Sequence, residues 1–491
     1  MLQKIGFDSE KFIKLEKAAI LERISHLTGK LYMEMGGKIF DDLHASRVLP
    51  GYQPDNKIKI LESLKDQLEI VICISAKDIE KNKIRADFGI TYDLEVLRLI
   101  DNLKAIGLSV NSVCITLFNK QPSATKFAER LERRGEKVYY HYIIDGYPDN
   151  INKIVSEEGY GKNAYIETTK PLVVVAAPGP GSCKMATCLS QMYHESKMGL
   201  KSGYAKFETF PVHNLPLNHP VNIAYEAATA DLQDRNMIDP YHLDEYGTEE
   251  VSYNRDIEAF PVLKNIFDRI QGDCMYKSPT DMGVNEVAKC IIDDEVCREA
   301  GRQEIIRRYI RSQTEYKKGY TSKTTINTIR NIMRAYGVNE NDRVVYKVAH
   351  EKQMEKGCHI VAIELTDGTL VTGKEQGVIT ATAGALLNAL KVLADIPHEN
   401  IVDRDSVKNL STLKNSLNLG SGLDLKDIFI AMSILSTEHG DSAKAINVIP
   451  SLKGAEVHAT YILPAADEDF LRKLQMNVTT DDVFPSDNLF E

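Results

Sequence analysis

The chain has 491 residues, of which 43% are hydrophobic and 26% charged, and its formal net charge is −10. This balance is typical of a globular protein that buries large cores, so the composition argues against a disordered chain. The 70 acidic and 60 basic residues include no long basic run, and nucleic-acid binding, which needs a concentrated basic face, is not expected.

The location and the domain number also follow from simple patterns. The N-terminal run MLQKIGFDSEKF lacks the apolar core of a signal peptide, and no segment reaches the roughly 18 apolar residues of a membrane span. We therefore expect a cytoplasmic protein without a membrane partner. Eight scattered cysteines form no C-x-x-C pair, which favours buried thiols over a zinc site. Three domains are predicted, covering residues 1–250, 251–340 and 341–491.

The first domain alternates short apolar runs with amphipathic helical stretches between residues 31 and 210. This rhythm predicts an α/β fold with an open, mostly parallel, doubly wound sheet, whose ligands bind beyond the carboxyl ends of the strands. Four strands are predicted, at residues 68–75, 112–118, 137–144 and 171–177.

The last of these strands runs directly into a P-loop-like glycine loop at residues 179–187. Glycine allows backbone amides to approach a phosphate, and the helix that follows offers unpaired N–H groups and a positive dipole end. A lysine would add a full charge and a nearby hydroxyl a further ligand. The predicted cofactor-binding residues are Gly179, Gly181, Ser182, Lys184 and Thr187.

The letters of the loop match the G-x-x-x-x-G-K-[ST] pattern only in part. Pro178 occupies the first glycine position, Cys183 the last, and Met185 replaces the hydroxyl residue. The context, with a strand before the loop and a helix after it, supports phosphate binding better than the letters do. The alternative is that the glycines and prolines simply turn the chain.

Candidate catalytic groups follow the loop. His213 lies in a proline-rich segment after a predicted strand end, where a general acid or base could sit. Asp231 belongs to a polar stretch whose carboxylates could hold Mg²⁺ against a bound phosphate. We thus predict Lys184, Asp231 and His213 as catalytic residues, with Asp231 as the metal ligand.

The remaining chain divides into a helical part and a smaller α+β part. Charged helical patterns run from about residue 256 to residue 336. The C-terminal part opens with a hairpin signal around Asp367 and Gly368, followed by helices at residues 381–393 and 425–436 and a strand at 456–463. His458 lies in this strand, where burial with a backbone partner is the simplest interpretation.

Several long runs resemble a bacterial family called domain of unknown function 1846. They include ADFGITYDLEVLRLID, PLVVVAAPGPGSCKMATCLSQMYHE and IIDDEVCREAGRQEIIRRY. The resemblance covers nearly the whole chain and implies no established activity or catalytic residue. Family members commonly read G-P-G-S-G-K in the loop, so the resemblance implies that Cys183 replaces a glycine.

The leading hypothesis is an enzyme of phosphoryl or nucleotidyl chemistry that binds ATP, another nucleotide or a different phosphorylated small molecule at the loop, with Mg²⁺. One alternative is a non-catalytic anion or nucleotide sensor or scaffold. Another is a dinucleotide-dependent oxidoreductase, although no G-x-G-x-x-G follows the first strand. A homo-oligomer is the expected assembly.

Overall fold

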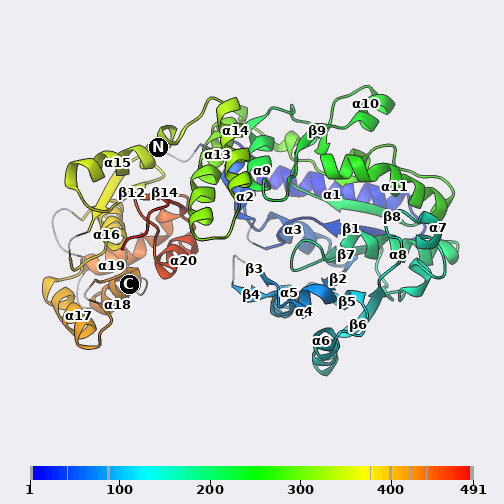
Figure 1. Ribbon diagram of the computed structural model, residues 1–491, viewed down its shortest axis with the longest axis horizontal. Coiled ribbons are helices and arrows are strands. Elements are labelled where there is room, and N and C mark those ends of the chain that lie inside the picture. The colour runs from blue at the N-terminus through cyan, green and yellow to red at the C-terminus, as the bar shows by residue number, and fades with distance from the viewer. Residues whose placement is uncertain are drawn as a thin grey trace. The chain divides into compact units, whose positions relative to one another are not determined.

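The computed structural model describes residues 4–40, 42–85, 89–375, 377–396, 401–420, 422–437 and 440–486. These residues form two compact units. The N-terminal unit comprises Ile5–Glu226 and Asp234–Gly301, and the C-terminal unit is mainly Arg302–Glu491 together with the short segment Ala227–Gln233. Figure 1 colours the chain from blue to red along this course.

The N-terminal unit is built on a seven-stranded sheet in the order β11-β8-β1-β7-β2-β5-β6, and every neighbouring pair is parallel. The labels from β8 to β6 follow one another in this order in Figure 1. The predicted α/β class with a parallel sheet is therefore confirmed. The strands are β1 (Leu31–Met35), β2 (Leu68–Ser75), β5 (Val110–Phe118), β6 (Lys137–Tyr142), β7 (Leu172–Ala176), β8 (Gly203–Phe207) and β11 (Gly283–Val284).

Every residue of β2 and β7 is buried, because helices cover both faces of this sheet. On one face, Val173 and Val175 of β7 belong to the same apolar cluster as Leu189 of α8 and Phe260 of α11. The helices are α1 (Ser9–Ser25), α2 (Leu43–Val48), α3 (Asn56–Ser63), α4 (Ala76–Glu80), α5 (Tyr92–Ala105), α6 (Pro122–Arg133), α7 (Ile151–Ile154), α8 (Lys184–Lys197), α9 (Pro220–Ala228), α10 (Pro240–Tyr246), α11 (Asn254–Gln271) and α12 (Pro279–Met282).

The strand order places a change of direction between β1 and β7. From β1 the chain continues to β2 on one side, whereas from β7 it continues to β8 on the other side. Because crossovers between parallel strands are right-handed, the two connections leave on opposite faces of the sheet. Open α/β sheets bind ligands at such a switch point. The carboxyl ends of β1 and β7 are therefore the expected place for a site.

The C-terminal unit contains a four-stranded mixed sheet in the order β13-β12-β14-β15. One face packs against α16, α18, α19 and α20, and the other against α15. The separate C-terminal α+β sheet domain predicted from the sequence is confirmed. The elements are α14 (Lys323–Ala335), α15 (Val344–Lys356), β12 (Ile360–Glu364), β13 (Leu370–Lys374), α16 (Ala381–Leu393), α17 (Arg404–Ser416), α18 (Leu425–Leu435), α19 (Gly440–Asn447), β14 (Glu456–Ala459), α20 (Ala465–Lys473) and β15 (Asn477–Thr480).

The helices expected between residues 251 and 340 are present, but they do not belong to one unit. α11 lies in the N-terminal unit and α14 in the C-terminal unit, while α13 (Asp294–Lys317) begins in the first and ends in the second. The division into three domains at residues 250 and 340 stays a prediction. In the described part of the chain, no helix combines the length and the apolar character needed to cross a bilayer.

Candidate functional site

The glycine loop is a tight turn between the end of β7 and the first residue of α8. Gly181 has φ +82°, an angle that glycine adopts readily. The Ser182 hydroxyl donates to the carbonyl of Gly179 at 3.0 Å, and the Thr116 hydroxyl donates to the carbonyl of Ser182 at 3.1 Å. The loop is thus closed by its own serine and tied to β5.

Gly179 is required by a close approach to Tyr92, the first residue of α5. A Cβ at this position would lie 2.3 Å from the Tyr92 hydroxyl oxygen, far inside contact distance. The Nζ of Lys83 lies 4.7 Å from the centroid of the Tyr92 ring and donates to the carbonyl of Pro180 at 3.4 Å. Gly179 therefore lets the loop rest directly on an aromatic side chain.

Cys183, at the position where the resemblance implied a glycine, has a left-handed backbone with φ +59° and ψ +35°. An L-residue loses about 1–2 kcal/mol in this conformation relative to the right-handed one. The turn retains its geometry despite the cysteine, at the expense of backbone strain. Burial raises the pKa of the Cys183 thiol, so the side chain is a neutral thiol at pH 7.

The helix that follows presents its N-terminus and a lysine to the loop. No side chain caps α8, and the first-turn amides of any helix have no intrahelical acceptor. The Nζ of Lys184 lies 3.4 Å from Oε1 of Glu34 on β1, and the two side chains are only 14% and 12% exposed. Tyr204 donates to the other oxygen of Glu34 at 3.0 Å. Lys184 is therefore held at the switch point and does not extend into solvent.

A second lysine lies beside this pair on the neighbouring strand. Lys206 of β8 is the register partner of Glu34. Its Nζ forms ion pairs with Glu208 and, at 2.6 Å, with Asp256 in the first turn of α11. We call Glu34, Lys184, Lys206, Glu208 and Asp256 the edge cluster, since they gather at the carboxyl edge of β1 and β8.

Electrostatics make the edge cluster sensitive to pH. Burial alone would lower the pKa of Lys206, but Glu208, Asp256 and Glu34 outweigh burial and raise it, so Lys206 is cationic. Burial raises the pKa of Glu208 to about 7, against the lowering effect of Lys206. Protonation of Glu208 near neutral pH therefore removes one negative charge from the edge cluster.

Two other predicted residues, Thr187 and His213, belong to the same unit, and both are buried. The Thr187 side chain is buried, and its hydroxyl donates to the carbonyl of Cys183 at 3.1 Å, within the first turn of α8. His213 is buried within electrostatic reach of Lys206 and Asp256, and burial followed by the Lys206 charge lowers its pKa to about 4. His213 is therefore neutral at pH 7.

Asp231 is exposed and belongs to the segment Ala227–Gln233 of the C-terminal unit, so the N-terminal unit does not bring it to the glycine loop.

The edge-cluster carboxylates were not predicted from the sequence. The available signal was a charged residue near the carboxyl end of each of two short apolar runs, LYMEM with Glu34 and GYAKF with Lys206. Neither run was among the predicted strands.

Together these features define an α/β protein with an open parallel sheet and a lysine-bearing glycine loop at its carboxyl edge. Two family models then account for almost the whole chain. The N-terminal model of domain of unknown function DUF1846 matches residues 5–337, and the C-terminal model of DUF1846 matches residues 341–490. The chain belongs to this family.

Full-length relatives with similar sequences occur in several bacteria. A UPF0371 protein of Fusobacterium nucleatum is 50% identical, with 99% of each chain covered. A UPF0371 protein of Clostridium botulinum is 51% identical over 99% of each chain, and one of Streptococcus thermophilus is 50% identical over 100% of each. The chain is thus similar to these proteins along its entire length.

Proposed function

We propose that this protein is an enzyme that binds a nucleotide or another phosphorylated small molecule at the glycine loop and acts on it by phosphoryl or nucleotidyl chemistry. The observation that carries the proposal is the position of Lys184, which is the first residue of α8 and pairs with Glu34 at the switch point of the sheet. Uncapped amides of α8 and the Lys184 ammonium together form the kind of surroundings that bind phosphate.

The ion pair between Lys184 and Glu34 is consistent with this role. A lysine that neutralises phosphate needs a partner when the phosphate is absent, because a buried unpaired charge is costly. Glu34 supplies that partner at 3.4 Å. On binding, the anion would replace Glu34 as the principal partner of Lys184, while Tyr204 continues to donate to Glu34.

Any Mg²⁺ that accompanies the nucleotide needs carboxylate oxygens near the phosphates. Glu34 and Asp256 of the edge cluster fit this requirement better than the exposed Asp231. Lys206 would hold these carboxylates in place and add positive charge beside the phosphate. His213, which is neutral at pH 7, would serve as a hydrogen-bonding group near this cluster.

The test is calorimetric titration of ATP, GTP and inorganic phosphate into wild type and Lys184→Ala. Lys197→Ala is the matched control, because Lys197 lies on the same helix and is 62% exposed. We expect Lys184→Ala to weaken binding by at least about tenfold, or about 1.4 kcal/mol, and Lys197→Ala to bind as wild type. Equal binding to wild type and Lys184→Ala, or no binding to either, would remove the proposal. Tight binding without turnover would favour a non-catalytic sensor.

A further inference from the structure

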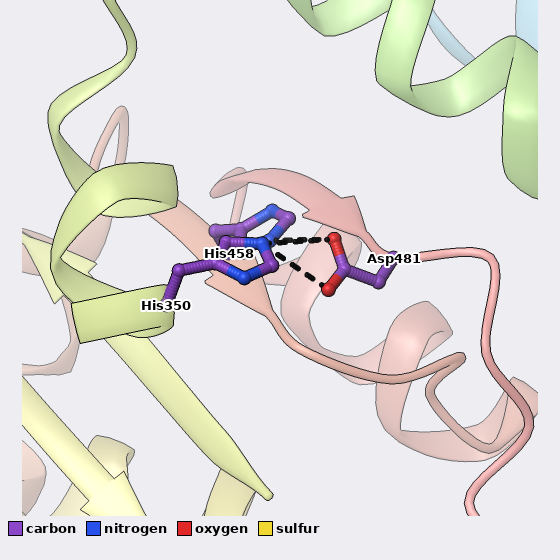
Figure 2. A group of neighbouring side chains, drawn as sticks. All are labelled: His350, His458 and Asp481. Atoms are coloured by element: carbon purple, nitrogen blue, oxygen red, sulfur yellow. Dashed lines mark hydrogen bonds and ion pairs between the residues drawn. The ribbon is translucent and has the colours of Figure 1, made fainter. Parts of the chain in front are cut away.

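A second group of chemically active side chains lies in the C-terminal unit, far along the sequence from the glycine loop. His350 belongs to α15, His458 to β14, and Asp481 directly follows β15. Figure 2 shows the two imidazoles beside one another, with the carboxylate of Asp481 facing them. The three residues come from three elements and converge on one point.

The fold of the unit explains this convergence. Ala362 of β12 is the register partner of His458 and packs against Val345 and Ala349 of α15. Side chains alternate between the faces of a strand, so His458 lies on the sheet face that α15 covers. His350 directly follows Ala349 in α15, and its ring centroid lies 5.7 Å from that of His458.

The distances within the group match those of a metal site. The Nε2 atoms of His350 and His458 each lie 3.2 Å from an oxygen of Asp481, and the three donor atoms lie within 4.8 Å of one another. Zinc bound tetrahedrally at about 2.0–2.2 Å places its ligand atoms roughly 3.3–3.5 Å apart. Only the two imidazoles would need to move closer together.

The hydrogen bonds around His458 leave one of its nitrogens as a free acceptor. The Thr479 hydroxyl donates to the carbonyl of Val457 at 3.1 Å, so its oxygen accepts from its two other neighbours, Nε of Arg343 and Nδ1 of His458. With the hydroxyl proton directed to Val457 in this way, Nδ1 carries the proton of the neutral ring and Nε2 keeps a lone pair.

The lone pair of Nε2 faces a second hydrogen-bond acceptor, the carboxylate of Asp481. Nε2 of His458 is fully buried and has no hydrogen bond among the described residues, yet it lies 3.2 Å from an oxygen of Asp481. Two acceptors so close together repel each other unless a cation lies between them. The neighbouring Arg343 does not supply it, because its guanidinium is paired with Glu456.

We infer that His350, His458 and Asp481 bind a divalent transition-metal ion, with zinc as the best match. Imidazole nitrogen suits zinc and its neighbours in the series, and two histidines with one carboxylate leave a coordination position for solvent. The hydrogen bond from Nδ1 of His458 to Thr479 provides the support that a metal-binding histidine requires. His350 and Asp481 are 26% and 17% exposed, so an ion can enter.

The experiment uses the full-length protein, stripped of metal with a chelator and titrated with ZnCl₂ by calorimetry. His350→Ala removes the most exposed ligand, and Asp481→Asn keeps the shape of the third ligand but removes its charge. His359→Ala is the matched control, since His359 belongs to the same unit but lies outside this group. Absorption spectra after loading with Co²⁺ report the coordination independently, and thermal melting verifies that each variant is folded.

We expect wild type and His359→Ala to bind one zinc ion in this site with the same affinity. His350→Ala and Asp481→Asn should each weaken that affinity by about a hundredfold or more, since even outer-shell changes reduce affinity 10–100-fold. The inference is overturned if wild type binds no zinc below about millimolar concentration. It is equally overturned if a folded His350→Ala or Asp481→Asn binds zinc as wild type does. In either case a proton on Nε2 of His458, and not a metal ion, lies between this nitrogen and Asp481.

Discussion

The ion pair at the switch point gives the most specific test of the anion site. Glu34 lies 3.4 Å from Lys184, so a bound phosphate would meet a carboxylate of its own sign beside the lysine that attracts it. Replacing Glu34 with glutamine removes that charge. The amide oxygen of glutamine can still accept the hydrogen bond from Tyr204, so the strand end should keep its structure.

The size of the effect follows from Coulomb's law. Two unit charges roughly 6 Å apart interact by about 3 kcal/mol at an effective dielectric constant of 20. The site is partly open to solvent, since Lys184 and Glu34 are 14% and 12% exposed, and screening reduces this value. A remaining 1.4 to 2.8 kcal/mol corresponds to about 10- to 100-fold tighter binding of a free phosphate in Glu34→Gln.

The assay is calorimetry with inorganic phosphate in a buffer without Mg²⁺, at low and at physiological salt. Glu62→Gln is the matched control, because it makes the same charge change at an exposed position of α3. We expect Glu34→Gln to bind more tightly than wild type, and the difference to shrink as salt is added. Unchanged or weaker binding by Glu34→Gln would refute the assignment of Lys184 as the phosphate-binding cation.

Three further predictions concern other features of the N-terminal unit. Cys183→Gly should stabilise the protein by roughly 1 kcal/mol, because relief of the left-handed backbone exceeds the added freedom of the unfolded chain; Cys183→Ala should show no such gain in urea denaturation. Because Glu208 has a pKa of about 7, sulfate should bind several-fold more tightly at pH 6 than at pH 8, and Glu208→Gln should abolish the difference. Burial, partly offset by the Glu286 amide, raises the pKa of Glu16 from 4.5 to about 8, so its stabilising effect is complete below about pH 4.5 and lost as the pH rises through 8. Glu16→Gln should thus lose less stability than wild type between pH 6 and pH 9, and parallel losses would contradict this.

The strongly apolar strands could be predicted closely from the sequence. β2 begins and ends where it was predicted, at Leu68 and Ser75, and α16 also has the predicted bounds, Ala381–Leu393. Every residue of β2 is buried, whereas α16 buries residues at helical spacing and is capped by Thr380. The glycine loop was found for the same reason, because a fully buried strand precedes it.

The carboxylates of the edge cluster and the approach of Asp481 to the two histidines could not be predicted, because each depends on a strand without a clear pattern. β1 and β8 are five residues long and contain Glu34 and Lys206, which interrupt the apolar run. β15, which positions Asp481, reads NVTT and has little apolar character. In the sequence, 171 residues lie between Glu34 and Lys206. The sequence alone therefore does not show that these two residues are register partners on neighbouring strands.

Anion binding at the glycine loop can be observed directly in a crystal structure of the protein grown with tungstate, a phosphate analogue with strong anomalous scattering. We expect an anomalous peak within hydrogen-bond distance of the Lys184 ammonium and the first amides of α8. A well-ordered loop without a peak, in a crystal where tungstate binds elsewhere on the protein, would contradict it.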